Sequence, residues 1–132
     1  MHIVPKVQTI CYFDTVDPNS RKTLLSKKIT APFKTKKFRA SFPAGTNRLN
    51  KLRFFIVSSP DTPTLEPPVG TDLLFSLGQV NFITGSDNSI EFEHEVINRE
   101  SNVYIAVHAE NTDAFAHTIE CQVTIEFIEL TD

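Results

Sequence analysis

Apolar and polar residues alternate one by one near the end of the chain, over residues 118–127. A β-strand places successive side chains on opposite faces of its sheet. This stretch therefore predicts a strand with one buried face and one face in water. The apolar set is Ile119, Cys121, Val123, Ile125 and Phe127, and the polar set between them is Glu120, Gln122, Thr124 and Glu126.

The same period of two recurs through the rest of the chain with less regularity. Residues 51–58 differ, because their apolar side chains fall on both faces, which is typical of a central strand covered on both sides. Residues 90–96 and 103–109 repeat the one-sided pattern. The full set of predicted strands is 7–13, 21–30, 37–42, 51–58, 72–77, 79–84, 90–96, 103–109 and 118–127.

Turn-forming residues separate these strands, and no segment has a clear helical period beyond a short turn within 111–116. Residues 58–70 contain four prolines, which predicts a surface loop instead of a strand. Eight or nine short strands at this spacing predict an all-β fold. We expect an antiparallel β-sandwich of about eight strands, jelly-roll-like, with residues 1–132 as a single domain.

The charges are divided between the two halves of the chain. Residues 1–58 hold 12 of the 13 Lys and Arg, and residues 59–132 hold 14 of the 16 Asp and Glu. Two explanations stay open. The first is cross-strand pairing within one monomer, if basic strands lie beside acidic strands. The second is two separate charged surfaces through which copies of the chain meet.

Candidate chemistry is sparse. The four glycines are isolated, so no phosphate-binding loop is present, and no nucleophile motif occurs. His108 and His117 flank a loop with Glu110 and Asp113, but their spacing matches no metal motif. We therefore expect no enzymatic activity, no cofactor and no metal site.

The two cysteines, Cys11 and Cys121, lie in the first and last predicted strands. Each falls in an apolar alternation, so both are interpreted as small buried side chains. If the terminal strands are neighbours, the two thiols could also come close enough to pair. A disulfide is the less favoured alternative, because the chain start has no apolar signal segment and we expect synthesis in the cytoplasm without export.

In size and strand pattern, the chain resembles small jelly-roll modules, which occur in lectins and in accessory or cement proteins of viral particles. We predict a non-enzymatic structural protein that assembles with itself or a protein partner, as in virion cement or capsid decoration. The alternative is a carbohydrate-binding, lectin-like module, in which Tyr12, Tyr104 or surface Phe residues would form the platform.

The predicted partners are therefore protein, as a homo-oligomer or larger assembly, with carbohydrate as the alternative. No apolar run is long enough for a membrane span. Nucleic acid is disfavoured, because the sequence pI is near 5.8. A second candidate contact is the proline-rich loop at residues 60–68. The candidate interaction residues are Lys34, Lys36, Lys37, Arg39, Glu91, Glu93 and Glu95, with the basic set meeting the acidic set of a neighbour.

Overall fold

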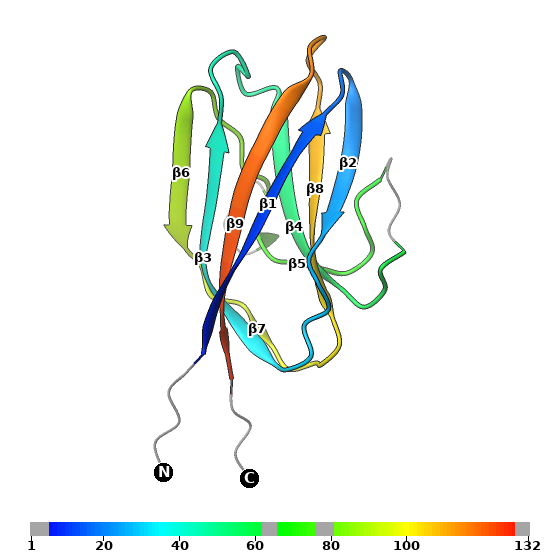
Figure 1. The fold of residues 1–132 in the computed structure, drawn as a ribbon, viewed down its shortest axis with the longest axis vertical. Coiled ribbons are helices and arrows are strands. Elements are labelled where there is room, and N and C mark those ends of the chain that lie inside the picture. The colour runs from blue at the N-terminus through cyan, green and yellow to red at the C-terminus, as the bar shows by residue number, and fades with distance from the viewer. Residues whose placement is uncertain (1–5, 62–65, 76–80, 129–132) are drawn as a thin grey trace.

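A computed structural model describes residues 6–61, 66–75 and 81–128. Nine β-strands and no helix longer than a single turn occur in these ranges (Figure 1). The strands are β1 (Val7–Val16), β2 (Ser20–Leu25), β3 (Phe33–Phe42), β4 (Asn50–Val57), β5 (Thr71–Asp72), β6 (Asn88–Glu93), β7 (Ile97–Asn98), β8 (Tyr104–Asn111) and β9 (His117–Phe127).

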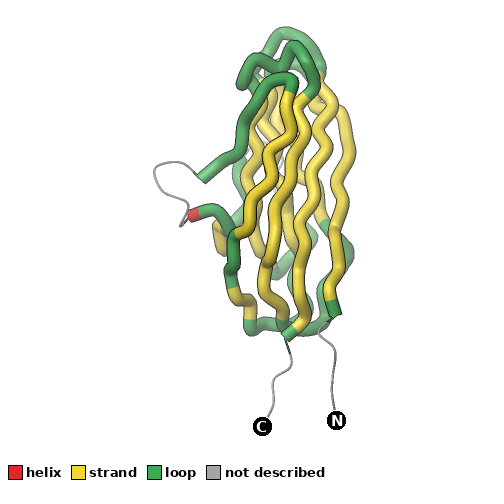
Figure 2. Tube along the Cα trace, turned by 90° about the vertical axis from the view of Figure 1, so that its left-hand side faces the viewer, coloured by secondary structure: helices red, strands yellow, loops and turns green. Residues whose placement is uncertain are grey.

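The strands form two antiparallel sheets that stack as a sandwich, seen from the side in Figure 2. One sheet has the order β1-β9-β3-β6, with β7 also paired to β3, and the other has the order β2-β8-β4-β5. Strand β1 thus pairs with β9, β2 with β8, β3 with β6 and β4 with β5. These are the pairs of one long antiparallel hairpin that is folded into two stacked sheets. This order is that of a jelly roll, and it confirms the predicted fold.

The core lies between the two sheets. Phe38 is fully buried and contacts Phe54 edge-on at a centroid distance of 5.2 Å, while Phe92 stacks on it at 5.5 Å. Strand β4 is covered on both sides, as its composition predicts. Phe54 and Ile56 point into the main core, whereas Phe55 and Val57 pack with Ala106 of β8 in a smaller apolar cluster.

Several predicted strands are wrong in extent. The strand predicted over 21–30 ends at Leu25, and the strand predicted over 90–96 ends at Glu93. Of the strand predicted over 72–77, residues 76 and 77 lie outside the described ranges. In the described part the strand ends at Asp72, because the Asp72 carboxylate accepts a hydrogen bond from the Leu74 amide at 3.0 Å and closes a turn. Within 79–84, residues 79 and 80 lie outside the described ranges. The described remainder contributes only an isolated bridge from Ile83 to Leu52.

Strand β3 begins four residues before its predicted start at residue 37. A β-bulge between Thr35 and Lys37 interrupts the alternation, so that Lys36 and Lys37 are both exposed while Thr35 and Phe38 are buried. A bulge inserts one residue into the period of two, which is why the pattern of apolar residues missed this half of the strand.

Candidate interaction surfaces

The predicted interaction residues lie together on the outer face of the sheet that contains β3. Lys34, Lys36, Lys37 and Arg39 lie on β3, Glu91 and Glu93 lie on the neighbouring β6, and Glu95 follows β6. The structure therefore brings the predicted basic and acidic sets side by side within one chain.

Most of these charges form ion pairs inside the monomer. Lys37 Nζ lies 3.3 Å from Glu91 Oε1, and Lys34 Nζ lies 4.0 Å from Glu95 Oε2. Glu126 of β9, which is not among the predicted residues, forms ion pairs with both lysines. Its carboxylate oxygens lie 3.9 Å from Lys34 Nζ and 3.5 Å from Lys36 Nζ. The side chains are between 20% and 54% exposed, so each pair contributes at most about 1 kcal/mol.

Arg39 and Glu93 form no ion pair with another described residue. Both are exposed and are separated by two positions along the β3–β6 ladder. A contact of the seven predicted residues with a neighbouring copy stays a prediction, but five of them already have a partner in their own chain.

The jelly-roll order explains the division of charge between the two halves of the chain. Further pairs join Arg21 to Glu110 at 3.4 Å and Arg53 to Asp72 at 3.4 Å, across neighbouring strands. Among the described residues, six of the seven Lys or Arg ion pairs join a base from the first half to an acid from the second. The first of the two explanations given above, cross-strand pairing within one monomer, therefore accounts for these charges.

Strand β1 is a ten-residue edge strand, and among the described residues it pairs only with β9 (Figure 1). The Phe127 amide donates to the Lys6 carbonyl at 2.9 Å. Because hydrogen-bonded residues alternate along an antiparallel ladder, the even-numbered residues of β1 direct their backbone groups toward β9. The odd-numbered residues direct theirs away from the sheet. We call Val7, Thr9, Cys11 and Phe13 the open edge of β1.

At the C-terminal end of β1, side chains occupy the outward backbone groups, which blocks the addition of another strand there. The open edge has no such protection among the described residues. At Thr15, the amide donates to the Asp14 carboxylate at 2.7 Å, and the carbonyl accepts from Lys22 at 3.4 Å. Proteins usually protect an edge strand with charged side chains, proline, a bulge or short length. The opposite edge of the sheet, β6, carries Glu91 and Glu93, whereas the four residues of the open edge carry no charge.

Two of the open-edge side chains are large, apolar and exposed. Val7 is 56% exposed and Phe13 is 73% exposed. Phe13 borders a shallow hollow of about 440 Å³ whose other walls are mostly polar, including Asp87, Asn88 and Glu120. Phe13 is thus a surface Phe residue of the kind that the lectin-like alternative requires. Its position opposite Ile10 and Tyr12 in the alternation was the available signal.

Tyr12 does not form the surface platform considered for a lectin-like module. It is 5% exposed, and its hydroxyl donates to the Ile105 carbonyl at 2.7 Å across the core. Tyr104 is half-buried against the smaller apolar cluster of Phe55 and Val57. The tyrosine hydroxyl of residue 12 is instead a link between the two sheets.

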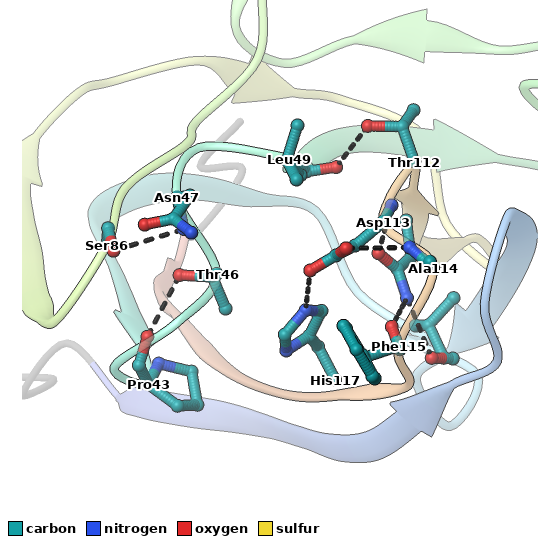
Figure 3. Close-up of polar contacts among 12 residues, drawn as sticks. Pro43, Thr46, Asn47, Leu49, Ser86, Thr112, Asp113, Ala114, Phe115 and His117 are labelled. Carbon is teal, nitrogen blue, oxygen red and sulfur yellow. Dashed lines mark hydrogen bonds and ion pairs between the residues drawn. The ribbon is translucent and has the colours of Figure 1, made fainter.

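The loops at the end of the sandwich away from the termini hold a compact polar cluster (Figures 1 and 3). His117 Nε2 lies 2.6 Å from Asp113 Oδ2, and this hydrogen bond is the main cause that lowers the pKa of Asp113. The Asn111 side chain donates to the carbonyls of Val16, Asp17 and Phe115. The cluster joins the β1–β2 turn to the β8–β9 turn, so its histidine and carboxylate have structural partners.

His108 lies apart from this cluster, on the face of β8 that points away from the main core. It is 2% exposed, and its Nδ1 lies 3.0 Å from Thr23 Oγ1. Burial is the largest cause that lowers the pKa of His108, and the nearby Arg21 and Arg53 add to it. No group of three metal-ligating side chains occurs within the described ranges.

The two cysteines have different environments, although β1 and β9 are neighbours. Cys11 lies opposite Gln122, and Cys121 lies opposite Tyr12, so the thiols are one register position apart on opposite faces of the sheet. Cys121 is buried and Cys11 is exposed, and both are free. The burial of Cys121 is confirmed. The interpretation of Cys11 as a buried side chain is wrong, and the alternative of a disulfide between the two thiols is contradicted.

The proline-rich loop considered as a second contact is only partly described, since residues 62–65 lie outside the described ranges. Pro60 is exposed and Pro68 is buried. Val69, which follows, is 94% exposed. A contact through this loop stays a prediction.

No protein-family model and no curated protein sequence matches this chain. Several solved structures resemble it weakly. A chain from the Bacillus endospore appendages, described as disulfide-linked pili, has 17% identity and a TM-score of 0.48, with 96% of this chain and 89% of that chain covered. A chain of infectious bursal disease virus strain Gx has 8% identity and a TM-score of 0.46, with 94% and 32% covered.

The Yersinia pseudotuberculosis-derived mitogen has 9% identity and a TM-score of 0.40, with 98% of this chain and 91% of that chain covered. These neighbours include a pilus, a virus and a mitogen. Likenesses this weak carry no information about what this chain binds, so its function has to be inferred from its own surfaces. In the described part of the chain, no helix has the length and apolar character to cross a membrane.

Proposed function

We propose that this chain is a non-enzymatic structural protein that assembles with itself or with another protein through an exposed sheet edge. The observation that carries the proposal is the open edge of β1. Its backbone donors and acceptors have no partner strand among the described residues, and its exposed side chains include Val7 and Phe13. Such an edge is a template for adding another strand.

The charges support an assembly that does not depend on electrostatic contacts. The ion pairs of β3, β6 and β9 neutralise each other within one chain. An interface made from the open edge would instead rely on backbone hydrogen bonds and apolar contact. These interactions are screened by salt much less than pairs of exposed charges.

Sedimentation velocity over a range of protein and salt concentrations tests this proposal. We expect self-association that increases with protein concentration and persists in high salt. Dissociation by salt would favour the contact between Lys34, Lys36, Lys37 and Arg39 of one copy and the glutamates of another. A chain that stays monomeric at millimolar concentration and binds no protein would contradict the proposal. Virion cement or capsid decoration is its finer form, and co-sedimentation with purified particles tests it.

The hollow beside Phe13 favours carbohydrate binding as a second candidate function. An exposed aromatic ring next to Asp87, Asn88 and Glu120 combines a flat apolar surface with hydrogen-bonding groups. Glycan-array binding that Phe13→Ala abolishes would support this function. An array without signal for the wild-type chain would remove it.

A further inference from the structure

The open edge of β1 is a segment with Ile10 at its midpoint. Its four residues are Val7, Thr9, Cys11 and Phe13. Each of the four directs one backbone N–H and one C=O away from the sheet, as the bond from Phe127 to Lys6 establishes. Above this segment, Asp14 and Lys22 engage the backbone groups of Thr15 and limit the free edge.

We propose that the open edge of β1 pairs with the same edge of a second copy, antiparallel, across a two-fold axis at Ile10. This inference rests on the proposed function and names its surface and partner. Only one two-fold register lets all the outward backbone N–H and C=O groups of the open edge form hydrogen bonds. It places Val7 opposite Phe13 and Thr9 opposite Cys11 in both halves, and about eight new backbone hydrogen bonds form.

The side chains favour the same register. On the outer face, the two exposed apolar residues meet, Val7 of each copy beside Phe13 of the other, and such pairs stabilise antiparallel strands. On the other face, the register places Lys6 opposite Asp14 of the second copy, a carboxylate that also pairs with Lys22 of its own chain at 2.9 Å. Shifting the second strand by two residues in either direction separates Val7 from Phe13 and Lys6 from Asp14. The side chains and the backbone hydrogen bonds therefore favour the same register.

Two of the other sheet edges, β6 and β5, are poorer partners. Two copies of β6 would place Glu91 and Glu93 against the same carboxylates, and like charges directly opposite destabilise a strand pair. Pairing β1 with β6 would put those carboxylates against an open edge without a cation. Strand β5 has only two residues. Beside β1 lies a groove of about 550 Å³, bordered by Ile10, Leu25 and Ile29 and by the polar side chains of Lys6, Lys27 and Lys28.

The native thiol of Cys11 allows a direct test of the register. In the proposed dimer, Cys11 faces Thr9 of the other copy, at a Cα separation of about 5.5 Å that suits a disulfide. The double variant Thr9→Cys, Cys11→Ser is mixed with wild-type chain and oxidised mildly. We expect a covalent dimer of twice the 14.9 kDa chain mass in the mixture, and little or none in either protein alone.

The matched control is Thr124→Cys, Cys11→Ser, mixed with wild-type chain in the same way. Thr124 lies directly beside Thr9 on β9, with 3.2 Å between their hydroxyl oxygens, but one strand away from the edge. We expect this mixture to crosslink at least about tenfold more slowly, because its thiol lies beyond disulfide distance from Cys11 of the second copy. Equal crosslinking in both mixtures would overturn the proposed register.

A second pair of variants tests the edge without any covalent bond. Thr9→Pro removes an amide that points away from β9, so the ladder within the monomer keeps its bonds. Thr9→Lys places a charge on the same edge, and Thr124→Lys is its control. We expect both Thr9 variants to keep the circular dichroism of the wild type and to weaken dimerisation by at least about tenfold, with little effect of Thr124→Lys.

The outcomes separate this inference from the proposed function. Self-association that neither Thr9 variant weakens, without crosslinking specific to the Thr9→Cys mixture, would overturn the β1 pairing and leave assembly through another surface. A wild-type chain that stays monomeric and binds no protein would overturn both. An interface of seven residues per strand is smaller than a standard one, so we expect the dimer to dissociate on dilution.

Discussion

Two buried asparagines that face each other across the β4–β8 ladder should differ strongly in their contribution to stability. Asn50 and Asn111 are register partners, and each is 1% exposed. The Asn111 amide nitrogen lies 3.2, 3.1 and 2.8 Å from the carbonyl oxygens of Val16, Asp17 and Phe115, and its Oδ1 accepts from the Asp113 amide at 3.0 Å. The Asn50 side chain has no partner among the described residues.

Substitution by alanine removes hydrogen bonds at Asn111 but only unpartnered polar atoms at Asn50. Asn111→Ala leaves up to three carbonyls and one amide without their partner, and each lost hydrogen bond costs about 1 kcal/mol. We expect Asn111→Ala to lower the free energy of unfolding by about 2–4 kcal/mol. Asn50→Ala removes two polar atoms that are buried without a partner, which offsets the lost packing, so we expect a change within about 1 kcal/mol.

Urea unfolding followed by circular dichroism measures both effects, with the slope of the transition as a check on two-state behaviour. The reasoning predicts a lower midpoint for Asn111→Ala at an unchanged slope, and a midpoint near that of the wild type for Asn50→Ala. Equal losses at both positions would show that burial alone determines the cost. A loss below about 0.5 kcal/mol for Asn111→Ala would refute a role for its hydrogen bonds.

Three further effects follow from the polar groups. The hydrogen bond from His117 lowers the pKa of Asp113. The stabilisation from the Asp113 carboxylate is therefore present above the unfolded pKa of about 4 and is lost as the pH falls through the folded pKa. Thermal melts of the wild type and Asp113→Asn should differ at neutral pH and converge in acid. Burial raises the pKa of Cys121 to about 12, so a thiol reagent should modify only Cys11 in the native state, and fast modification of both would contradict the structure. Glu126→Gln, which loses two lysine partners, should cost about 1 kcal/mol or less in urea unfolding at low salt and almost nothing in about 1 M salt; an equal cost at both would exclude an ionic origin.

The alternation of side chains predicted the sandwich because each long strand has one face in the core. Residues 118–127 and 103–109 follow the period of two closely, and they form the central strands β9 and β8. The strand over 37–42 was recovered only in its second half, since the bulge at Thr35–Lys37 shifts the period by one residue. Short strands such as β5 and β7 hold two residues each, too few for any periodicity to appear.

Alternation placed Lys37 and Arg39 on one face of their strand and Glu91 and Glu93 on one face of theirs, but the partners of these residues depend on strand order. Glu126 receives two lysines because β9 lies beside β3, although 90 residues separate Lys36 from Glu126 in sequence. Local pattern does not encode which strands are neighbours. Cys11 is exposed because it lies on the outer face of β1, opposite the inward-facing side chains of Ile10 and Tyr12.

The division of charge along the chain therefore says more about folding than about partners. A jelly roll wraps its first half against its second, so every long strand of the basic half lies beside a strand of the acidic half. Opposite charges then meet within the monomer at a small gain each, and the outer face of β3, β6 and β9 becomes nearly neutral. The outward backbone groups of the open edge are of another kind: they are uncharged, and they have no partner strand among the described residues. If the open edge is the assembly surface, those four residues determine which partner fits, because their outward backbone groups have no partner strand in the described part of the chain.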